Sequence, residues 1–298
     1  MPTLKPINEP TTNPTTNPAN DPTPNPIKMI AVDMDGTFLN DEKQYDKARF
    51  LELYAELKAR DIRFVVASGN QYYQLVHYFP EIEHEIGFVA ENGAYVVDAG
   101  EEIHCGKFAD EEVSRILKLL AEIPEINLVV CGKNSAYAHS SMPQEIVEKM
   151  SNHYRRLKKV EDFSTVDDVI FKFSLGVQND VIPTLLKKLA REVGDITQPV
   201  SSGFGFIDLI VPGLHKANGL SLLQARWGIH EDNVVAIGDS DNDIEMLRHA
   251  AFSFAMANAS PAVTKVATFS TESNNQQGAL NVIARVLNGE APFKIHNN

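Results

Sequence analysis

Short apolar runs alternate with segments of helical periodicity on both sides of a differently patterned middle part. Residues 29–32 and 62–67 are apolar runs typical of buried strands, and residues 45–60 between them carry apolar side chains at helical spacing. This alternation predicts βαβ units and a parallel sheet. Further strands are expected at residues 88–90, 234–237 and 252–256, and further helices at residues 220–227, 244–250 and 280–287.

The middle part mixes helices and strands in another way. We interpret residues 108–211 as a small α/β domain inserted between the two halves of a larger one, residues 27–107 and 212–298. The expected fold class is therefore α/β, with a parallel-sheet core and a smaller inserted domain. The insertion contains helical segments at residues 110–122 and 181–192 and strand-like runs at residues 127–131, 169–177 and 206–211.

Composition limits the partners and the location of the protein. The chain of 298 residues is 43% hydrophobic, as expected of a globular protein, and its net charge of −13 argues against a nucleic-acid or anionic-membrane partner. A small anionic substrate stays compatible, because one lysine and a metal ion can reverse the local field. No apolar run approaches the roughly 18 residues of a membrane helix and no secretion signal is recognisable, so a cytoplasmic protein is expected. Residues 1–26, rich in Pro, Thr and Asn, are interpreted as a disordered leader.

Carboxylates, a hydroxyl and a lysine at the ends of the predicted strands suggest phosphoryl transfer. The first apolar run is followed by Asp33 and Asp35 in the sequence DMDGT, and ligands of open parallel sheets bind beyond such strand ends. Asp33 is the candidate nucleophile, because a carboxylate can attack phosphorus and form an aspartyl-phosphate. Asp35 is the candidate general acid and base for the leaving alkoxide and the attacking water. Alternatively, either aspartate only forms a turn or caps a helix.

A second acidic segment, GDSDND, follows the apolar run at residues 234–237. It places three carboxylates within five residues, which repel one another unless a cation lies between them. Mg²⁺ prefers such hard oxygen ligands. Asp239 and Asp33 are the main candidate ligands, Asp243 is a secondary or water-mediated one, and the backbone carbonyl of Asp35 completes the predicted site. The alternative for this segment is an acidic helix cap, which we expect to describe Asp241 in any case.

Phosphate oxygens need hydrogen-bond donors and a fixed positive charge. Ser68 follows the second apolar run, and its hydroxyl, together with Gly69 and Asn70, forms the candidate phosphate-binding loop. Lys216 can neutralise charge on both the nucleophile and the phosphate, and Asn242 is a further candidate for phosphate binding. Taken alone, the Ser-Gly pair is equally typical of a turn or helix cap, and a single lysine is usually solvated.

The DMDGT segment at Asp33, the strand-terminal Ser68, the later Lys216 and the GDSDND segment resemble the four motifs of the haloacid-dehalogenase-like superfamily. The resemblance covers about residues 28–290 and extends to the Cof-type subgroup, in particular to bacterial sugar-phosphate phosphatases. It implies a Rossmann-like core, a mobile cap over the active site, Mg²⁺ dependence, an aspartyl-phosphate intermediate and hydrolysis of small phosphate monoesters. Dehalogenases lack the second aspartate, here Asp35, so carbon–halogen cleavage is disfavoured.

The resulting prediction is a Mg²⁺-dependent, monomeric phosphatase acting on a small phosphorylated metabolite, expected to be a sugar phosphate. A phosphomutase with the same nucleophile is the alternative enzyme, and a phospho-accepting signalling module is disfavoured because such modules carry no inserted domain. Specificity is expected to come from the cap, with residues 134–142 and 201–206 as candidates. The segment from Glu91 to Gly93 forms either another edge of the crevice or a β-turn. Among the histidines only His215 is close to a candidate residue, and none has the spacing of a metal site.

Overall fold

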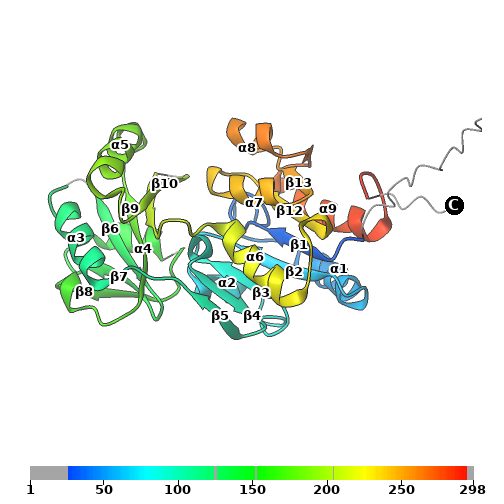
Figure 1. Cartoon of the computed structure of the whole chain (residues 1–298), viewed down its shortest axis with the longest axis horizontal. Helices are drawn as coiled ribbons and strands as arrows, with labels where there is room; N and C mark the ends of the chain where they lie inside the picture. Colours follow the sequence, from blue (N-terminus) through cyan, green and yellow to red (C-terminus); the bar gives the residue numbers. More distant parts are fainter. Residues whose placement is uncertain (1–25, 124–125, 152, 204, 294–298) are drawn as a thin grey trace, which may run out of the picture.

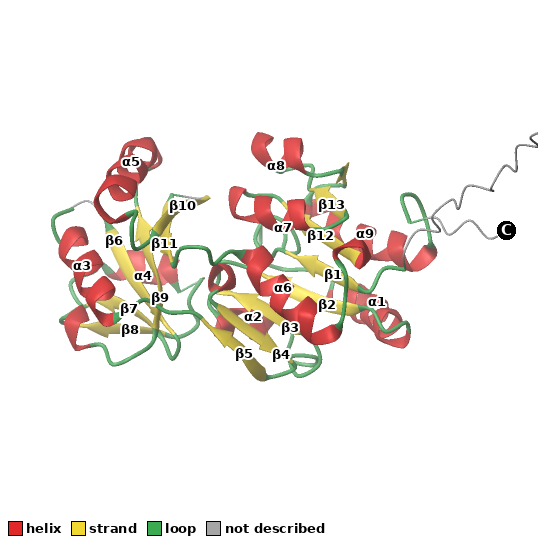
Figure 2. Ribbon diagram, viewed as in Figure 1, coloured by secondary structure: helices red, strands yellow, loops and turns green. Residues whose placement is uncertain are grey.

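The computed structural model describes residues 26–123, 126–151, 153–203 and 205–293 and contains two β-sheets with helices packed on them (Figure 1, Figure 2). One sheet has eight strands and the other has six. The predicted α/β fold class with a parallel-sheet core is confirmed. Residues 1–25 of the predicted leader lie outside the described ranges. No helix within these ranges is both long enough and apolar enough to cross a membrane.

The eight-stranded sheet brings three distant segments of the chain together. Its central strand β1 (Met29–Val32) lies between β2 (Arg63–Ala67) and β12 (Val234–Gly238), and all three strands run parallel. Their carboxyl ends meet at one edge of the sheet, so the residues that follow each strand lie side by side. The other strands are β3 (Gly87–Ala90), β13 (Phe252–Ala255) and β14 (Phe269–Ser270), which are parallel, and β4 (Tyr95–Asp98) and β5 (Glu101–Cys105), which are antiparallel.

Helices cover both faces of this sheet and enclose two apolar cores. Side chains alternate along β1, so that Ile30 and Val32 point into one core, and Met29 and Ala31 point into the other. Burial on both faces explains why these strands are continuous apolar runs in the sequence. The first core is closed by α1 (Lys47–Ala59), α2 (Tyr72–Tyr78) and α9 (Gly278–Asn288), and the second by α6 (Lys216–Trp227), α7 (Ile244–His249) and α8 (Pro261–Val266).

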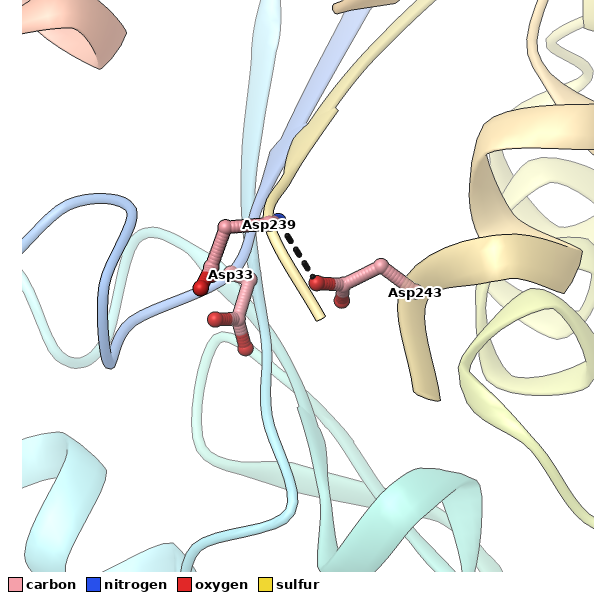
Figure 3. Close-up of side chains that lie close together, drawn as sticks. All are labelled: Asp33, Asp239 and Asp243. Atoms are coloured by element: carbon pink, nitrogen blue, oxygen red, sulfur yellow. Dashed lines mark hydrogen bonds between the residues drawn. The ribbon is translucent and has the colours of Figure 1, made fainter. Parts of the chain in front are cut away.

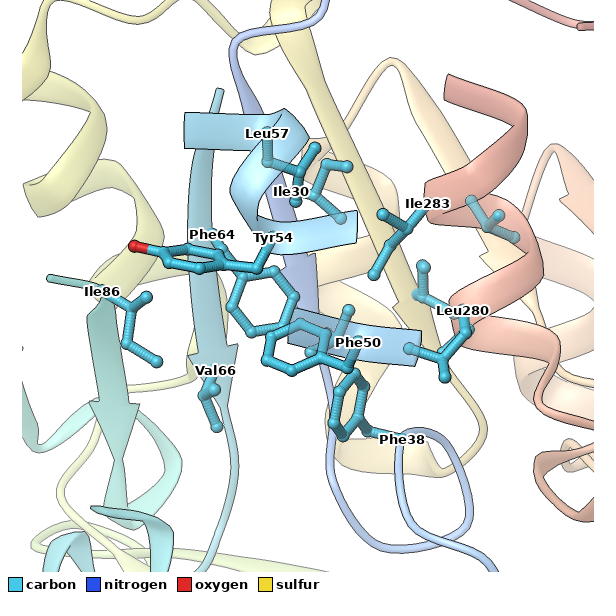
Figure 4. Packing of buried hydrophobic residues seen from close by; sticks show 14 of the residues in the cluster. Ile30, Phe38, Phe50, Tyr54, Leu57, Phe64, Val66, Ile86, Leu280 and Ile283 are labelled. Carbon is cyan, nitrogen blue, oxygen red and sulfur yellow. The ribbon is translucent and has the colours of Figure 1, made fainter. Parts of the chain in front are cut away.

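A cluster of aromatic rings in the first core anchors the loop that follows β1 (Figure 4). The Phe50 ring on α1 lies 5.1 Å from that of Phe38 and 5.0 Å from that of Phe64, measured between centroids. Phe38 comes directly after the DMDGT segment, and its backbone N–H donates to the Asp33 carbonyl at 3.2 Å. Aromatic packing therefore fixes the position of the two predicted catalytic aspartates.

The second sheet is smaller and mostly antiparallel, and it lies beside the first sheet (Figure 2). All its strands fall within residues 108–211. That this range is an inserted domain with these limits stays a prediction. In sheet order, its strands are β10 (Gln198–Gly203), β11 (Phe206–Ile210), β9 (Ile170–Gly176), β6 (Asn127–Gly132), β7 (Ala136–His139) and β8 (Leu157–Val160), and its helices are α3 (Asp110–Leu120), α4 (Gln144–Met150) and α5 (Ile182–Val193).

The central strand β9 has two chemically different faces, although all its residues are buried. Phe173 packs into the apolar core beneath the helices, whereas Lys172 and Ser174 point to the opposite side. Asp208 of β11 is in register with Ser174 and shares that side. Lys172 Nζ donates to the carbonyl of Gly69 at 2.6 Å. The polar face of the second sheet thus lies against the carboxyl edge of the first.

Several short elements were not predicted from the sequence. They are α2, α4, α8, the hairpin of β4 and β5, and the strands β7, β8, β10 and β14, which are too short to produce a clear period. Helix α6 was expected at residues 220–227 but begins at Lys216. The reason is local: His215 is the N-cap residue, and its backbone N–H donates to Asn218 Oδ1 at 3.2 Å.

Replacing Phe50 tests the aromatic anchor. Phe50→Ala is expected to lower the free energy of unfolding by about 3–5 kcal/mol, because the ring is fully buried and its removal leaves a cavity. Urea denaturation followed by circular dichroism measures this loss. Leu222→Ala, at a position that is 37% exposed, is the control and should change the free energy by no more than about 0.5 kcal/mol. Equal losses in the two variants would contradict the anchoring role.

Candidate active site

Three buried aspartates meet at the carboxyl edge of the first sheet (Figure 3). Asp33 follows β1, Asp239 follows β12, and Asp243 ends the short 3-10 turn before α7. One carboxylate oxygen of each lies within 4.8 Å of the others. The parallel pairing of β1 with β12 is the cause, because it places the ends of both strands side by side.

Lys216 supplies positive charge to this cluster. Its side chain is 0% exposed, and its Nζ lies 2.6 Å from Asp33 Oδ1 and 2.6 Å from Asp243 Oδ1. Burial acts to lower the pKa of Lys216, but the two carboxylates outweigh burial and raise the pKa above its ordinary value. The lysine is therefore charged at neutral pH, and the two aspartates satisfy a buried ion that would otherwise be costly.

The cluster nevertheless holds more negative than positive charge. Burial and the nearby Asp243 raise the pKa of Asp33 well above its ordinary value, and the same two causes raise the pKa of Asp239 to about 7. A divalent cation would offset this excess, and carboxylate oxygens are the ligands that hard divalent cations prefer. The donor set formed by Asp33 and Asp239 therefore fits a metal ion.

Asp243 differs from the other two aspartates because both of its oxygens are engaged within the protein. Its Oδ1 accepts from the buried lysine, and its Oδ2 accepts from the backbone N–H groups of Asp239 and Ser240, each at 3.0 Å. Its carboxylate therefore shapes the loop after β12. Asp241 is not the cap that was expected: Ser240 occupies the N-cap position of the turn, and Asp241 Oδ1 accepts from Ser260 Oγ at 2.8 Å.

The loop after β1 packs tightly against the loop after β12. A Cβ at Gly36 would lie 2.5 Å from Asp239 Oδ2, and the φ of +78° also favours glycine at this position. Thr37 Oγ1 donates to Asp239 Oδ1 at 2.8 Å. Thr37 thereby orients the Asp239 carboxylate, a role that was not predicted because it depends on contact with a segment far away in the sequence.

Asp35 points toward a separate pair of donors. Lys43 Nζ lies 2.5 Å from Asp35 Oδ1, and Asn70 Nδ2 donates to Asp35 Oδ2 at 2.6 Å. Burial acts to raise the pKa of Asp35, but the Lys43 ammonium and the hydrogen bonds outweigh burial and lower the pKa below its ordinary value. The role of Lys43 was missed, since a lysine in a polar loop carries no sequence pattern. The predicted contact of Asn70 with phosphate stays a prediction.

Backbone hydrogen bonds join the loop after β2 to the turn after β3. The Ser68 carbonyl accepts from the Asn92 N–H at 3.0 Å, and the Asn70 carbonyl accepts from the Glu91 N–H at 3.1 Å. Ser68 Oγ accepts from the Asn70 N–H at 3.1 Å. On the other side, Asn242 Nδ2 donates to Asn92 Oδ1 at 3.0 Å. The turn at Glu91–Gly93, whose role the sequence did not decide, therefore connects the candidate phosphate loop to the acidic loop after β12.

A cavity of about 660 Å³, its open mouth included, lies over these loops. One side is formed by the loops at the carboxyl edge of the first sheet, and the other by the second sheet and the segment after α4. The first side contributes Asp33, Asp35, Ser68, Gly69, Asn70, Ser240 and Asn242, and the second contributes His153, Tyr154, Lys172, Ser174, Phe206 and Asp208.

One predicted specificity segment does not reach this cavity. None of the residues 134–142 lines it. The strand β7 in this segment lies near the edge of the second sheet, separated from β9 by β6. Asn134 serves the sheet instead, because its backbone N–H and its Nδ2 donate to the Asp168 carboxylate at 2.9 and 3.0 Å.

The other predicted segment contributes in part. Phe206 of the range 201–206 lines the cavity, whereas Phe204 lies outside the described residues. His153 also lines the cavity, and its ring lies 5.8 Å from that of Phe206. The expectation that His215 was the histidine near the site is therefore incomplete. No local pattern marks His153, because the packing of the second sheet on the first brings it there.

Known proteins resemble this chain over most of its length. The family model of haloacid dehalogenase-like hydrolases matches residues 30–283. The Escherichia coli K12 protein named 5-amino-6-(5-phospho-D-ribitylamino)uracil phosphatase YbjI is 49% identical over 267 residues, with 90% of this chain and 98% of that protein covered. YitU of Bacillus subtilis strain 168, which has the same enzyme name, is 25% identical, with 87% and 96% covered. The crystal structure of SMU.1108c from Streptococcus mutans UA159 has a TM-score of 0.85 and 37% identity, covering 88% of this chain and 99% of that one.

Divalent-cation binding is expected to release a proton and to strengthen as pH rises through about 7. In chelator-treated protein the Asp239 carboxyl, with a pKa of about 7, holds a proton below that pH, and a cation binds the ionised form. Calorimetric titration with magnesium chloride, in buffers of different ionisation enthalpy, counts the released protons. Asp239→Asn should release fewer protons than the wild type, because the carboxyl group with the pKa of about 7 is gone. An affinity that stays constant between about pH 6 and pH 8 would contradict this linkage.

Proposed function

The chain belongs to the haloacid dehalogenase-like hydrolase family, and we propose that it is a Mg²⁺-dependent phosphatase that hydrolyses small phosphate monoesters through an aspartyl-phosphate. One observation carries the proposal. A candidate nucleophile, Asp33, and a second carboxylate, Asp35, line one cavity. Asp33 is paired with the buried Lys216, and Asp35 has its own donors. Phosphoryl transfer requires such a combination of nucleophile, proton carrier and fixed positive charge.

The proposed reaction has two steps. In the first, a carboxylate oxygen of Asp33 attacks phosphorus, the bond from phosphorus to the ester oxygen breaks, and Asp35 gives its proton to the leaving alkoxide. In the second, Asp35 takes a proton from a water molecule, whose oxygen attacks the phosphorus of the aspartyl-phosphate. The bond between phosphorus and Asp33 then breaks, which releases inorganic phosphate and restores both carboxyl groups.

Positive charge is needed because the nucleophile and the phosphate are both anions. Lys216, 2.6 Å from Asp33, acts to lower the raised pKa of that carboxyl group and opposes the repulsion between the nucleophile and the phosphate. When bound, Mg²⁺ supplies further positive charge to the phosphate oxygens. Its proposed ligands are Asp33, Asp239, the Asp35 carbonyl and, through water, Asp243. The proposed phosphate donors are Ser68, Gly69, Asn70, Asn242 and Lys216.

The surroundings of Asp35 fit a carboxyl group that changes protonation state during the cycle. Its lowered pKa keeps it ionised before substrate binds, which suits the second step. A bound phosphate group brings negative charge beside it and competes for Lys43, and both effects raise its pKa. Substrate binding therefore favours the protonated form that the first step requires.

We assign the cavity wall formed by the second sheet and the segment after α4, apart from Lys172, to the leaving group. His153, Tyr154 and Phe206 place aromatic rings there, and Ser174 and Asp208 add polar groups. Rings suit a flat heterocycle, and polar groups suit the hydroxyls of a sugar alcohol. The named substrate of the E. coli relative, 5-amino-6-(5-phospho-D-ribitylamino)uracil, has both parts. We propose the same compound here, within the wider class of sugar phosphates.

Two alternatives would use the same nucleophile. A phosphomutase would return the phosphoryl group to its substrate, and isomer interconversion without phosphate release would identify it. A phospho-accepting signalling module is disfavoured because a second sheet builds one wall of the site. We propose residues 27–107 and 212–298 as the catalytic part and residues 108–211 as a cap that selects the substrate. The proposal also includes a cytoplasmic monomer without a nucleic-acid or membrane partner.

Asp33→Asn is expected to lower phosphate release from the ribitylaminouracil phosphate by about 10⁴ to 10⁶, because an amide cannot form the aspartyl-phosphate. Released phosphate is measured colorimetrically with magnesium chloride, and with EDTA in a parallel sample. Asp61→Asn is the matched control: Asp61 is exposed, and its φ of 55° is one that asparagine tolerates. Turnover by Asp33→Asn at the control rate, or wild-type turnover in EDTA, would overturn the proposal.

Asp35→Asn is expected to separate the two steps. p-Nitrophenolate leaves without a proton, so this variant should release a burst of about one equivalent per site and then stall for lack of a base. The ribitylaminouracil phosphate, whose alkoxide needs the acid, should show no burst, and its turnover should fall by about 10² to 10⁴. Stopped-flow absorbance records the burst, with Asp61→Asn as the control. If Asp35→Asn hydrolyses p-nitrophenyl phosphate slowly and releases no initial burst of p-nitrophenolate, this result would argue against Asp35 as the acid and base.

A further inference from the structure

A buried lysine of the second sheet contacts the candidate phosphate loop and has no part in the reaction above. Lys172 on β9 is 2% exposed. Its Nζ donates to the Gly69 carbonyl at 2.6 Å and lies 2.9 Å from Glu91 Oε2. It also lies 3.5 Å from Asp208 Oδ2. One side chain of the inserted sheet thus contacts both loops that surround the phosphate position.

The pairing of Lys172 with Glu91 crosses between the two sheets in a fully buried place. Within the described residues, neither oxygen of Glu91 accepts a hydrogen bond, so Lys172 supplies its counter-charge at a distance of 2.9 Å. Replacing such a buried pair by apolar residues often leaves stability unchanged or improves it. The pair therefore calls for a reason other than stability, and its position beside Gly69 suggests one.

A second arm of the same network reaches the acidic loop after β12. Asp208 Oδ2 accepts from Asn92 Nδ2 at 3.2 Å. Asn92 Oδ1 in turn accepts from Asn242 Nδ2 at 3.0 Å, and Asn242 Oδ1 accepts from Ser240 Oγ at 2.6 Å. The polar face of the second sheet is therefore linked to the loops after β2, β3 and β12.

The turn held by this network has an unfavourable backbone. Glu91 and Asn92 have φ values of 51° and 57°, and Gly93 has a φ of 98°. Side chains other than glycine seldom adopt such values, and they persist where the surroundings over-determine them. A Cβ at Gly93 would also lie 2.4 Å from the His215 carbonyl oxygen, next to the catalytic lysine. The geometry of this turn thus depends on contacts from outside it.

We propose that Lys172 is a positioning residue, which gives the phosphate-binding loop and the Glu91–Gly93 turn their working geometry when the second sheet is seated on the first. It acts through the Gly69 carbonyl and Glu91 and contacts neither the nucleophile nor the leaving group. The inference rests on the proposed function of this site as a phosphatase. A positioning role differs from a substrate-selecting role in one measurable way. Loss of a positioning residue should weaken the binding of every phosphate compound equally, whereas loss of a substrate-selecting residue should affect only some of them.

The test compares Lys172→Met with Lys133→Met. Lys133 also pairs across the two sheets, at 2.6 Å from Glu102, but this pair is exposed, so its loss should alter activity by no more than about twofold. For each variant, kcat and KM are measured with p-nitrophenyl phosphate and with the ribitylaminouracil phosphate. Calorimetry gives the Kd of inorganic phosphate.

For Lys172→Met we expect kcat/KM to fall on the order of 100-fold for both substrates, with a weaker Kd for inorganic phosphate. A loss confined to the ribitylaminouracil phosphate, with the Kd of phosphate unchanged, would make Lys172 a leaving-group contact and overturn the inference. A lower Tm with unchanged KM and Kd would show that Lys172 has only a structural role, and this result would overturn the inference as well. If the unpaired Glu91 prevents folding, the double variant Lys172→Met/Glu91→Gln removes both charges and carries the same expectations.

Failure of the proposed function would give a different experimental result from failure of the inference about Lys172. A wild-type protein that hydrolyses neither compound would remove the phosphatase proposal whatever Lys172 does. The calorimetric Kd of inorganic phosphate would still compare Lys172→Met with Lys133→Met. Equal Kd values for these two variants would then dismiss the positioning role independently of turnover.

Discussion

A single buried lysine is the constraint on which the candidate active site depends. Lys216 begins α6 and lies 2.6 Å from both Asp33 and Asp243, so it joins the loops after β1 and β12 to this helix. Without it, three carboxylates would share one buried space. Even with it, negative charge is in excess, and the raised pKa values of Asp33 and Asp239 express that excess. A buried cluster with excess negative charge favours the binding of a divalent cation.

The rest of the fold maintains this arrangement. Parallel pairing sets the strand ends side by side, and the aromatic cluster around Phe38 and Phe50 holds the loop after β1 from behind. Tight approach at Gly36 and the bond from Thr37 fix the Asp239 carboxylate. None of these groups takes part in the proposed reaction, yet each helps to position a carboxylate oxygen of the site, and small displacements of such atoms are costly for catalysis.

Much of this could be predicted from the sequence, because the decisive residues follow apolar strands directly. Asp33, Ser68 and Asp239 needed only the rule that ligands bind beyond the carboxyl ends of parallel strands. Lys43 and His153 were missed because tertiary packing alone brings them to the site. Lys172 and Asp208 offered a usable signal: each is a charged residue inside a strand-like apolar run, where a buried charge requires a partner. The segment at residues 134–142 was expected at the cavity but does not line it, since nothing local tells which strands of a sheet face a distant cavity.

The central claim is that Asp33 becomes covalently phosphorylated. The most direct measurement mixes the protein with the ribitylaminouracil phosphate and magnesium chloride, stops the reaction with acid during turnover, and reduces it with borohydride before peptide mass spectrometry. Borohydride converts an aspartyl-phosphate to homoserine, so the account predicts homoserine at Asp33 only in the sample that received substrate. Phosphate release without any modification at Asp33, or with the modification at Asp35, would contradict it.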